Sequence, residues 1–354
     1  MRNINVIIYG VGAMGGNMLR LLQQRPGVRV VGAIEWDEHK IGRDAGEVAG
    51  LGRQLGITVK YPPEKVFDHV QADVVLHATT AFIDEAYPQI KEVLKRKINV
   101  VTITQELFFP IGENRKRAQE IDQLAQQAGV GVTAVGINPG FIMDLVPIVG
   151  SLPCWEIKQV TAKRVVDFAP YGPDEMVHIG AGLSADEFHA GGAAGKIGHI
   201  GLLETAAMVA HCLCLPVDEL KQTKVPLITR SVRKSEFITI PPGKVCGFLQ
   251  NVSGLYKGKT LLDYRMVGIV QPNPEEDGVE MGDYTRIEGT PSVDIRINEE
   301  ISQKGGLGTA AVAVNMIPRL LRAAPGFHTM NQLTLPHFWN GEEAPAYVEK
   351  ITYF

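Results

Sequence analysis

The stretch INVIIYGVGAMGGNMLRLL, residues 4 to 22, decides the fold of the first part of this chain. A β-branched apolar run ends at Tyr9, and three glycines follow in the GxGxxG order, directly before a segment with helical spacing. In that order the first glycine permits a tight turn, the second lets backbone N–H groups approach a pyrophosphate, and the third allows close helix packing. The alternative is a glycine-rich turn in some other α/β protein. The context predicts a dinucleotide-binding loop at the N-terminus of a helix, made by Gly10, Val11, Gly12, Ala13, Met14 and Gly15.

Outward from this stretch, strand and helix signals alternate. β-Branched runs at 28–34, 73–79, 98–104 and 130–136 are separated by amphipathic segments that include 81–97 and 113–129. Apolar strands separated by helices imply a parallel sheet covered on both faces, because parallel neighbours need crossover connections. We therefore predict an α/β fold with a doubly wound, Rossmann-type nucleotide-binding domain over residues 1–148.

The pattern changes after about residue 150, where longer strand-like runs follow one another. They predict a second, α+β domain over residues 149–304, built on a mainly antiparallel sheet. A helical run at 305–326, which we expect Gly326 to close, predicts that 305–328 packs back onto the first domain. Residues 329–354 form a C-terminal tail without an assigned role. The runs of the second domain lie at 155–168, 224–240, 244–258, 261–271 and 284–297, with a helix-like stretch at 200–215.

Composition excludes several classes of protein. A length of 354 residues predicts two domains, and 45% hydrophobic with 21% charged residues supports a sizeable core. The net charge of −4, without a basic stripe, argues against a nucleic-acid partner. The 4 cysteines have no CxxC spacing, which fits a reduced, cytoplasmic location. No apolar run reaches about 18 residues, so we expect neither secretion nor a membrane span. The sequence contains no His/Cys cluster with metal-ligand spacing, so we predict no metal site. It contains no GxSxG elbow, so a Ser/His/Asp hydrolase is not supported.

Two strand ends carry candidate cofactor contacts. Glu35 ends the second strand, where an acid meets the adenosine ribose and repels a 2′-phosphate, so we expect NAD. Lys40 and Arg43 follow closely and could reach a 2′-phosphate, which keeps NADP possible. The alternative for Glu35 is a plain solvent-facing residue at the end of the strand. The segment Ala78, Thr79 and Thr80 closes another strand and is expected to line the cofactor ribose. The competing interpretation makes Thr80 the N-cap of the next helix.

Glu106 is the candidate catalytic residue. It ends the strand-like run in VVTITQELFFPIG, residues 100 to 112, and we expect Leu107, Phe108 and Phe109 to form a water-poor wall around it. Burial raises the pKa of a carboxyl group toward the working pH, as a general base requires. Hydride removal from an amine needs such a base, because an alkylammonium with a pKa of about 10 must first lose a proton. The alternative is that Glu106 caps or salt-bridges the next helix, which begins near Glu113.

Further candidates are expected to contact the substrate. Asn138 precedes a proline and can contact nicotinamide or substrate, with a turn or N-cap role as the alternative. Phe141 follows in the same segment. His199 lies with His189 and Lys196 in a glycine-rich run, which would let a ligand come close. The alternative interpretation is that His199 only starts a helix and binds no ligand. Tyr171, Lys163 and Arg164 are candidates for binding the carboxylate and second amine of a substrate, and the sequence does not rank them.

Several of these segments together resemble a known family. IYGVGAMGGNMLRLL, VVTITQELFFP, GINPGFIMDLVP, GKIGHIGLLE and AVNMIPRLLRAAPGF are similar to the 2,4-diaminopentanoate dehydrogenases of ornithine breakdown and to related native amine dehydrogenases, from residue 4 to about 328. The resemblance implies NAD or NADP on a domain like that of dihydrodipicolinate reductase, substrate between the domains, and a catalytic glutamate at Glu106. It also implies a homodimer, with residues 149–304 serving substrate binding and dimerisation. Dihydrodipicolinate reductases are shorter and carry a His-His and a KxDAPSGT signature, which the segment HAGGAAGKIGHIG does not match.

The expected activity is therefore oxidative deamination of 2,4-diaminopentanoate to 2-amino-4-oxopentanoate and ammonia, reversible as reductive amination. The alternatives are an amine dehydrogenase for simple amines and ketones, a reductase like dihydrodipicolinate reductase, and a dinucleotide-binding sensor without chemistry.

Overall fold

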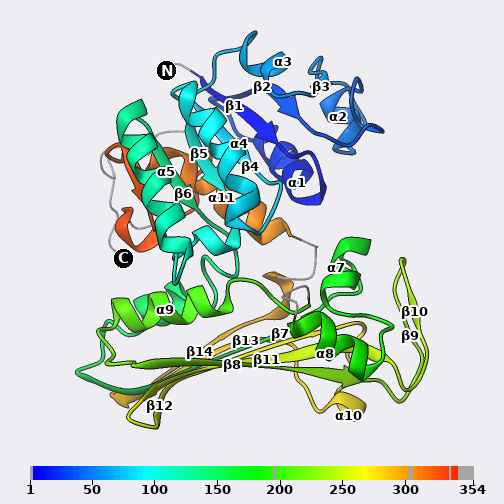
Figure 1. Cartoon of the computed structure of the whole chain (residues 1–354), viewed down its shortest axis with the longest axis vertical. Helices are drawn as coiled ribbons and strands as arrows, with labels where there is room; N and C mark the ends of the chain where they lie inside the picture. The colour runs from blue at the N-terminus through cyan, green and yellow to red at the C-terminus, as the bar shows by residue number, and fades with distance from the viewer. Residues whose placement is uncertain (1–2, 194–196, 302–305, 335, 342–354) are drawn as a thin grey trace, which may run out of the picture.

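A sheet of 7 parallel strands builds the first domain of the computed structural model, which describes residues 3–193, 197–301, 306–334 and 336–341. The strand order is β15-β6-β5-β4-β1-β2-β3 (Figure 1). Strands succeed one another outward from β1 in one direction and from β4 in the other, so the crossovers change direction between them. The predicted doubly wound α/β sheet is confirmed. Its strands are β1 (Ile4–Tyr9), β2 (Val28–Ile34), β3 (Val59–Lys60), β4 (Val74–His77), β5 (Asn99–Thr102), β6 (Gly131–Ala134) and β15 (Gly326–His328).

Helices cover both faces of this sheet. Right-handed crossovers place the helix after β1 and the helix after β4 on opposite faces. On one face α1 (Ala13–Leu22) packs against α11 (Leu307–Leu320), and on the other α4 (Ile83–Lys95) packs against α5 (Asn114–Ala128). The apolar residues of α11 belong to the same buried core as those of β1 and β4, although α11 follows the second domain in the chain. Short helices α2 (Ala45–Val48) and α3 (Glu64–Phe67) lie between β2 and β4.

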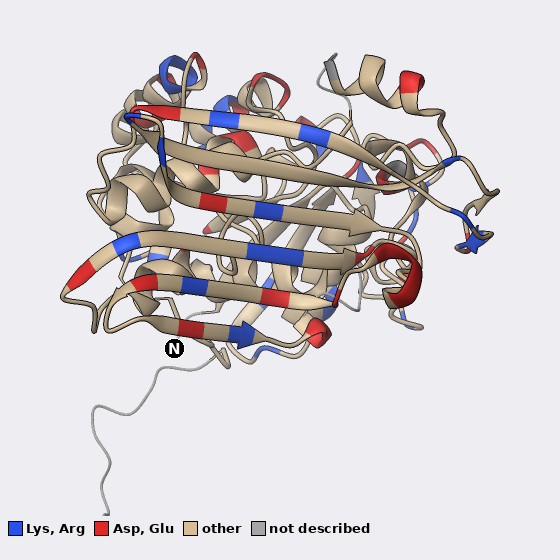
Figure 2. Ribbon diagram, turned by 90° about the horizontal axis from the view of Figure 1, so that it is seen from below, with Lys and Arg blue, Asp and Glu red and all other residues tan. Residues whose placement is uncertain are grey.

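The second domain is a mixed sheet of 6 strands in the order β14-β13-β7-β12-β11-β8. β7 and β12 are parallel and the other neighbours antiparallel, which confirms the mainly antiparallel prediction. The sheet lies below the first domain with α9 between them (Figure 1), and residues of both charges lie along its strands (Figure 2). Its elements are β7 (Glu156–Asp167), β8 (Glu219–Ile228), β11 (Val245–Tyr256), β12 (Lys259–Ile269), β13 (Gly282–Thr290), β14 (Val293–Ile297), α6 (Leu145–Gly150), α7 (Pro173–His178), α8 (Ala185–Ala193), α9 (Leu202–Cys212) and α10 (Pro274–Asp277), with the 3-10 turn η2 (Glu299–Ile301). The 3-10 turn η3 (Met330–Gln332) follows β15, and Met330 is buried in the core of the first domain.

Two predicted strands are divided in the structure. The run 224–240 contains only the end of edge strand β8, followed by the hairpin of β9 (Arg233–Lys234) and β10 (Thr239–Ile240). The run 284–297 is two antiparallel strands, β13 and β14, joined by a tight turn that contains Pro291. Proline cannot donate to a sheet ladder, so the break at Pro291 was readable from the sequence.

The end of the last helix also differs from the prediction. α11 ends at Leu320, and Gly326 has a φ of 135° and begins strand β15, so the expectation that Gly326 closes the helix is wrong. A Cβ atom at Gly326 would lie 2.7 Å from a carboxylate oxygen of Asp122, which accepts the Phe327 N–H at 2.8 Å. The glycine therefore serves the close approach of β15 to α5.

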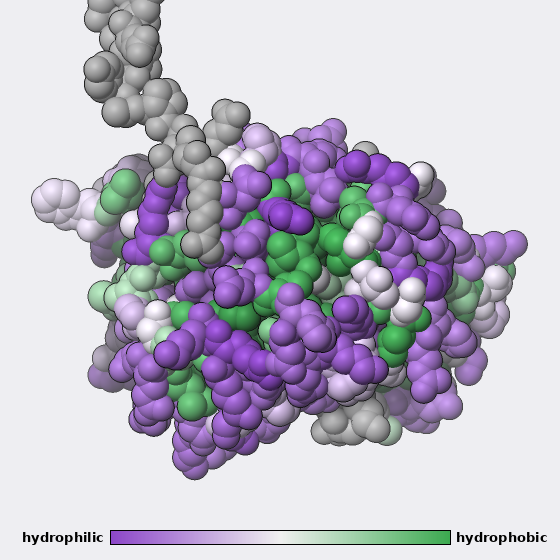
Figure 3. Space-filling view, turned by 90° about the horizontal axis from the view of Figure 1, so that it is seen from above, coloured by the Kyte–Doolittle hydropathy of each residue, from purple (hydrophilic) through white to green (hydrophobic). Residues whose placement is uncertain are grey.

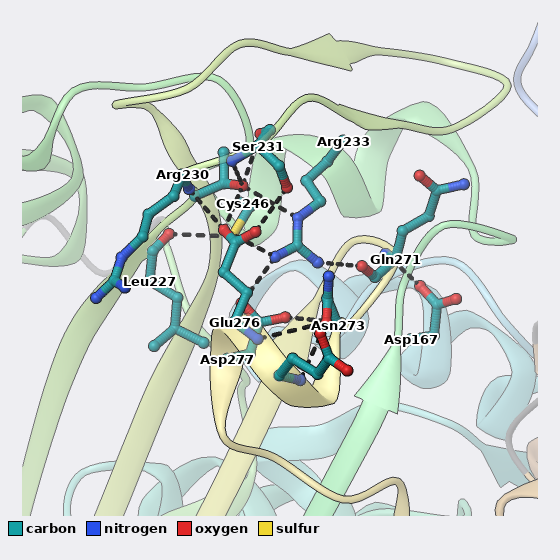
Figure 4. A network of polar contacts seen from close by, with 12 residues as sticks. Asp167, Leu227, Arg230, Ser231, Arg233, Cys246, Gln271, Asn273, Glu276 and Asp277 are labelled. Atoms are coloured by element: carbon teal, nitrogen blue, oxygen red, sulfur yellow. Dashed lines mark hydrogen bonds and ion pairs between the residues drawn. The ribbon is translucent and has the colours of Figure 1, made fainter.

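A buried polar network fixes the β9–β10 hairpin to the sheet (Figure 4). The Arg233 side chain is only 3% exposed, and its Nη2 lies 2.8 Å from Asp277 and 3.1 Å from Glu276 of α10. Its Nε donates to the Thr229 hydroxyl at 3.0 Å, and Nη1 donates to the Gln271 carbonyl. Because each face of the guanidinium fork has an acceptor, its burial is satisfied, and we regard the network as structural. No helix among the described residues is long and apolar enough to span a membrane.

Candidate active site

The glycine loop after β1 has the geometry that a diphosphate requires. Gly10 has a φ of 94°, and a Cβ atom there would lie 2.4 Å from the Ala78 carbonyl oxygen. A Cβ atom at Gly15 would lie 1.8 Å from the Gly10 carbonyl oxygen, so this glycine lets α1 pack on the loop. At Gly12 a Cβ atom would meet nothing within 4 Å. Open space at Gly12, beside the N-terminus of α1 at Ala13, leaves room for phosphate oxygens against backbone N–H groups.

Glu35 is buried at 5% exposure and ties the end of β2 to this loop. Its Oε2 accepts the Val11 N–H at 2.9 Å and its Oε1 accepts the Trp36 N–H at 2.9 Å, while the Lys40 ammonium lies 3.7 Å away. The alternative of a solvent-facing strand end is therefore wrong. Trp36 follows with 71% of its surface exposed.

The segment after β4 is largely engaged within the protein. The Ala78 N–H donates to the Tyr9 carbonyl, and the Thr79 hydroxyl donates to Gln89 Oε1 at 2.7 Å. The N-cap of α4 is Phe82, so the alternative that Thr80 is the N-cap is wrong. Thr80 instead accepts the Phe82 N–H at 3.2 Å in the turn before the helix. The segment lies at the carboxyl edge of the sheet, beside the glycine loop.

Glu106 lies in the 3-10 turn η1 (Gln105–Leu107) that follows β5. Its N–H donates to the Ala81 carbonyl at 3.1 Å, and its Oε2 accepts the Ile83 N–H at 2.9 Å. Glu106 therefore caps α4, the helix before it in the chain, and not the following helix α5. The carboxylate is half-buried at the carboxyl edge of the sheet, where ligands of open α/β sheets bind.

The surroundings of Glu106 raise its pKa. Burial is the main cause, the charges of nearby acids on α4 add to it, and the hydrogen bond from Ile83 opposes it. Leu107 and Phe108 are fully buried in the core of the first domain, and the Phe109 ring lies 5.6 Å from the His211 ring of α9. Leu107 and Phe108 therefore anchor the turn in the core, and Phe109 contacts α9 of the second domain.

Asn138 and His199 meet between the two domains. Asn138 Nδ2 lies 3.2 Å from His199 Nε2 and 3.5 Å from Met266 Sδ of β12. The main chain of His199 is held by Gln250 of β11, whose side chain accepts the His199 N–H at 2.8 Å and donates to its carbonyl at 2.9 Å. Burial, followed by the positive charge of Arg164, lowers the pKa of His199 to about 3, so the ring is neutral. The Asn138 Oδ1 atom is buried and has no partner among the described residues.

The strand β7 separates two basic candidates onto opposite faces. The Arg164 side chain is 3% exposed and forms a 2.9 Å ion pair with Asp283 on the inner face. Its charge lowers the pKa of His199 and opposes the rise that burial causes in the pKa of Tyr171. Lys163 points to the outer face, where its ammonium lies 5.9 Å from the Tyr284 ring. Arg164 and Tyr171 thus join the interdomain group, and Lys163 does not.

The remaining sequence candidates are dispersed. Phe141 is 36% exposed on the loop after Asn138, and the Met14 side chain lies against Gly306 at the start of α11. His189 is exposed on α8, where its ring meets Phe188 at 5.9 Å, and it is not brought to the site. Lys196 lies outside the described residues.

Glu204, in the first turn of α9, is a buried acid that our sequence interpretation missed. It is 7% exposed, and burial raises its pKa to about 7, with the charge of Glu106 as a further cause. A Cβ atom at the N-cap Gly201 would lie 3.4 Å from Gln105 Cβ, so the start of α9 lies directly against η1. The signal in the sequence is an acid within the apolar run IGLLETAAMVA, residues 200 to 210.

Other features do not compete with this site. Among the described residues, no group of three or more His, Cys, Asp or Glu side chains could hold a metal ion. A surface cavity of about 570 Å³ is lined by residues from the amino ends of β1 and β2, on the opposite edge of the first sheet. Figure 3, which shows the molecule from above, has apolar side chains gathered in the middle of this upper face.

Known proteins resemble both halves of the chain. The model of the 2,4-diaminopentanoate dehydrogenase C-terminal domain matches residues 141–348, and that of the dihydrodipicolinate reductase N-terminus matches residues 4–135. A 4-hydroxy-tetrahydrodipicolinate reductase of Sinorhizobium medicae is 40% identical over 87 residues, covering 23% of this chain and 31% of the relative. The reductase likeness is therefore confined to the first domain, which is of the NAD(P)-binding type.

Two relatives extend over nearly the whole chain. The structure of an amine dehydrogenase from Mycobacterium smegmatis has a TM-score of 0.84 at 25% identity, covering 95% of this chain and 98% of that one. The 2,4-diaminopentanoate dehydrogenase of Acetoanaerobium sticklandii is 34% identical over 97% of this chain and 96% of its own. The resemblance inferred from sequence segments is confirmed, and so is the expectation of an enzyme over a sensor. The chain belongs to the 2,4-diaminopentanoate dehydrogenase family, whose members are dehydrogenases that act on amines.

Proposed function

We propose that this protein catalyses the NAD(P)-dependent oxidative deamination of 2,4-diaminopentanoate at C4. The reaction consumes water and yields 2-amino-4-oxopentanoate, ammonia and the reduced cofactor, and it runs in reverse as reductive amination. The observation that carries the proposal is the half-buried Glu106 at the carboxyl edge of the first sheet, with its pKa raised by burial. The full-length relative from Acetoanaerobium sticklandii supports this choice of substrate.

Glu106 serves as the general base of the reaction. A nicotinamide held at this edge of the sheet would supply the acceptor for the hydride of the amine-bearing carbon. Before that step Glu106 removes a proton from the substrate ammonium, and the raised pKa brings its proton affinity closer to that of the amine. Its Oε2 is held by the Ile83 N–H, which fixes the orientation of the carboxylate. After hydride loss Glu106 releases this proton to solvent, and its carboxylate then assists the addition of water to the iminium carbon, after which ammonia leaves.

The first domain is suited to hold the cofactor with the glycine loop and Glu35. Open space at Gly12 accommodates the diphosphate, and the Glu35 carboxylate lies where the adenosine ribose reaches. Both oxygens of Glu35 already accept backbone N–H groups, so its negative charge is fixed in place. A 2′-phosphate would be repelled there, and we therefore propose NAD as the preferred cofactor, with Lys40 as the feature that permits NADP.

Arg164 is proposed to bind the substrate carboxylate. Arg164 lies on the inner face of β7 beside Asp283, and the planar fork of a guanidinium matches a carboxylate. Tyr171 and the neutral His199 are close enough for the charge of Arg164 to affect them, so a polar end of the substrate has several partners here. A simple amine has no group for this side of the site.

Substitution of Glu106 tests the proposal. Glu106→Gln removes the proton acceptor but keeps the size, so turnover of 2,4-diaminopentanoate should fall about a hundredfold or more. The dissociation constant for NADH should stay within about twofold. Glu113→Gln is the matched control, since Glu113 follows in the same loop but is 89% exposed. A near-normal turnover of Glu106→Gln would remove Glu106 from the mechanism.

A second candidate function is the oxidation of simple amines. The amine dehydrogenase structure from Mycobacterium smegmatis covers 95% of this chain and favours it. A substrate panel that compares 2,4-diaminopentanoate with cyclohexylamine, each with NAD and NADP, separates the two. Higher kcat/KM for cyclohexylamine would refute our choice of substrate.

A further inference from the structure

Two carboxyl groups from different domains come together at the proposed site. Glu106 follows β5 of the first domain, and Glu204 lies in the first turn of α9 in the second. Gly201, the N-cap of α9, approaches both Gln105 and the Pro139 ring, where a Cβ atom would lie only 2.7 Å from the proline. Glu204 is therefore held close to the Glu106 turn by direct packing of the main chain.

Glu204 has no partner that would explain its burial. Only 7% of the residue is exposed, yet among the described residues it has no ion pair and no hydrogen bond from another residue. Its neighbour Thr205 shows the contrast, because that hydroxyl donates to Asp144, which also accepts the Gly140 and Leu145 N–H groups. A buried carboxyl that the protein leaves without a cation is costly and points to a cation supplied from outside.

A separate observation points to a polar ligand at this place. Asn138 Oδ1 is buried without a partner among the described residues, while the other end of the amide is bound to His199. Asn138 precedes Pro139, the residue against which the start of α9 packs. One unsatisfied amide atom and one unpaired acid thus flank the same junction, and each lacks what a ligand amino group would provide.

The chemistry of a diamino acid matches this set of groups. A 2,4-diaminopentanoate molecule carries two amino groups and one carboxylate, so it needs two acceptors for ammonium groups and one cation. Glu106 takes the C4 amine and Arg164 the carboxylate in the proposed function, which leaves the C2 ammonium. A monoamine would leave one of the two carboxyl groups buried without a cation.

We propose that Glu204 binds the C2 ammonium group of the substrate, assisted by Asn138 Oδ1, and thereby makes the enzyme select diamino acids over monoamines. This inference rests on the proposed function. Burial raises the pKa of Glu204 to about 7, so the free carboxyl is close to half protonated at neutral pH, and a bound ammonium draws it into the ionised form.

The test compares two substrates that differ only in the C2 amino group, 2,4-diaminopentanoate and 4-aminopentanoate. Glu204→Gln should raise KM for 2,4-diaminopentanoate about ten- to a hundredfold, the loss expected for one charge-assisted hydrogen bond. KM for 4-aminopentanoate should change less than about threefold, and kcat for both should be nearly kept. Glu204→Asp, which retains the charge, should keep part of the preference. Glu219→Gln, at an exposed acid on β8, is the control.

The outcomes separate this inference from the proposed function. If the wild type oxidises 2,4-diaminopentanoate but Glu204→Gln changes KM equally for both substrates, or for neither, the assignment of Glu204 is wrong and the function stands. If the wild type oxidises 4-aminopentanoate and not 2,4-diaminopentanoate, the proposed function itself fails. Should Glu204→Gln not fold, the same comparison is made with Glu204→Asp, where an unchanged preference with an unchanged KM overturns the assignment.

Discussion

Alanine at Gly12 and alanine at Gly15 should have opposite effects, although the two glycines belong to one loop. Gly12 has φ −82° and ψ −159°, which any residue adopts, and nothing lies within 4 Å of its added Cβ atom. Gly12→Ala should therefore leave the free energy of unfolding within about 1 kcal/mol, in the stabilising direction. The added methyl group occupies the space through which the backbone approaches the diphosphate. Losing one charge-assisted hydrogen bond there should weaken NADH binding about ten- to a hundredfold.

Gly15→Ala should instead damage the fold. Its Cβ atom would lie 1.8 Å from the Gly10 carbonyl oxygen and 2.9 Å from the Gly10 carbonyl carbon, and the Ile8 side chain is at 3.2 Å. α1 must therefore move away from the loop by more than an ångström, which we expect to cost about 3 kcal/mol of stability. Urea denaturation followed by tryptophan fluorescence measures the stability, and NADH fluorescence titration measures the binding. Gly12→Ala with wild-type NADH affinity, or Gly15→Ala with wild-type stability, would refute the reasoning from Cβ contacts.

Three further predictions use contacts at the site. Arg164→Met should lower kcat/KM for 2,4-diaminopentanoate about a hundredfold. It should also cost about 3 kcal/mol of stability, because it leaves Asp283 buried without its cation. The control Lys163→Met, on the outer face, should change kcat/KM less than about twofold. Glu35→Gln removes the charge that repels a 2′-phosphate, so the ratio of kcat/KM with NADP to that with NAD should rise about tenfold, and an unchanged ratio would contradict the cofactor assignment. The pKa of Glu204 rises on folding from 4.5 to about 7, so the stabilisation that its protonated form gives is full below pH 4.5 and is lost as the pH rises through 7. A difference of one between two pKa values corresponds to about 1.36 kcal/mol. The free energy of unfolding of Glu204→Gln, relative to that of the wild type, should therefore be about 3 kcal/mol higher at pH 8 than at pH 4.5, which urea denaturation at both pH values measures.

Local patterns made much of the first domain predictable. The glycine loop, Glu35 and the strands around them are neighbours in the sequence, and their spacing is fixed by the turn that they form. The position of Glu106 was predictable for the same reason, because it lies in the turn that follows a strand of a parallel sheet. Its hydrogen bond to Ile83 was not, since that contact depends on how β4 and β5 lie side by side.

The second domain was less readable because its site residues come from tertiary contacts. Lys163 and Arg164 are adjacent basic residues, and only the phase of β7 decides which one faces inward. Glu204 looks like an ordinary first-turn acid until α9 is packed against the first domain. Strand β15 has only 3 residues, which is too short to show a strand periodicity, and it follows a helix. The hydrophobic pattern of the sequence therefore gave no sign of it.

The order of the elements along the chain also bears on how this protein is made. α11 and β15 complete the first domain, but they emerge from the ribosome only after the whole second domain has been synthesised. Until then the apolar surface of α1 that contacts α11 is exposed, and the nascent sheet has an open edge at β6, where chaperones or aggregation would act. A fragment ending near residue 150 should therefore be insoluble, even though it contains the entire glycine loop.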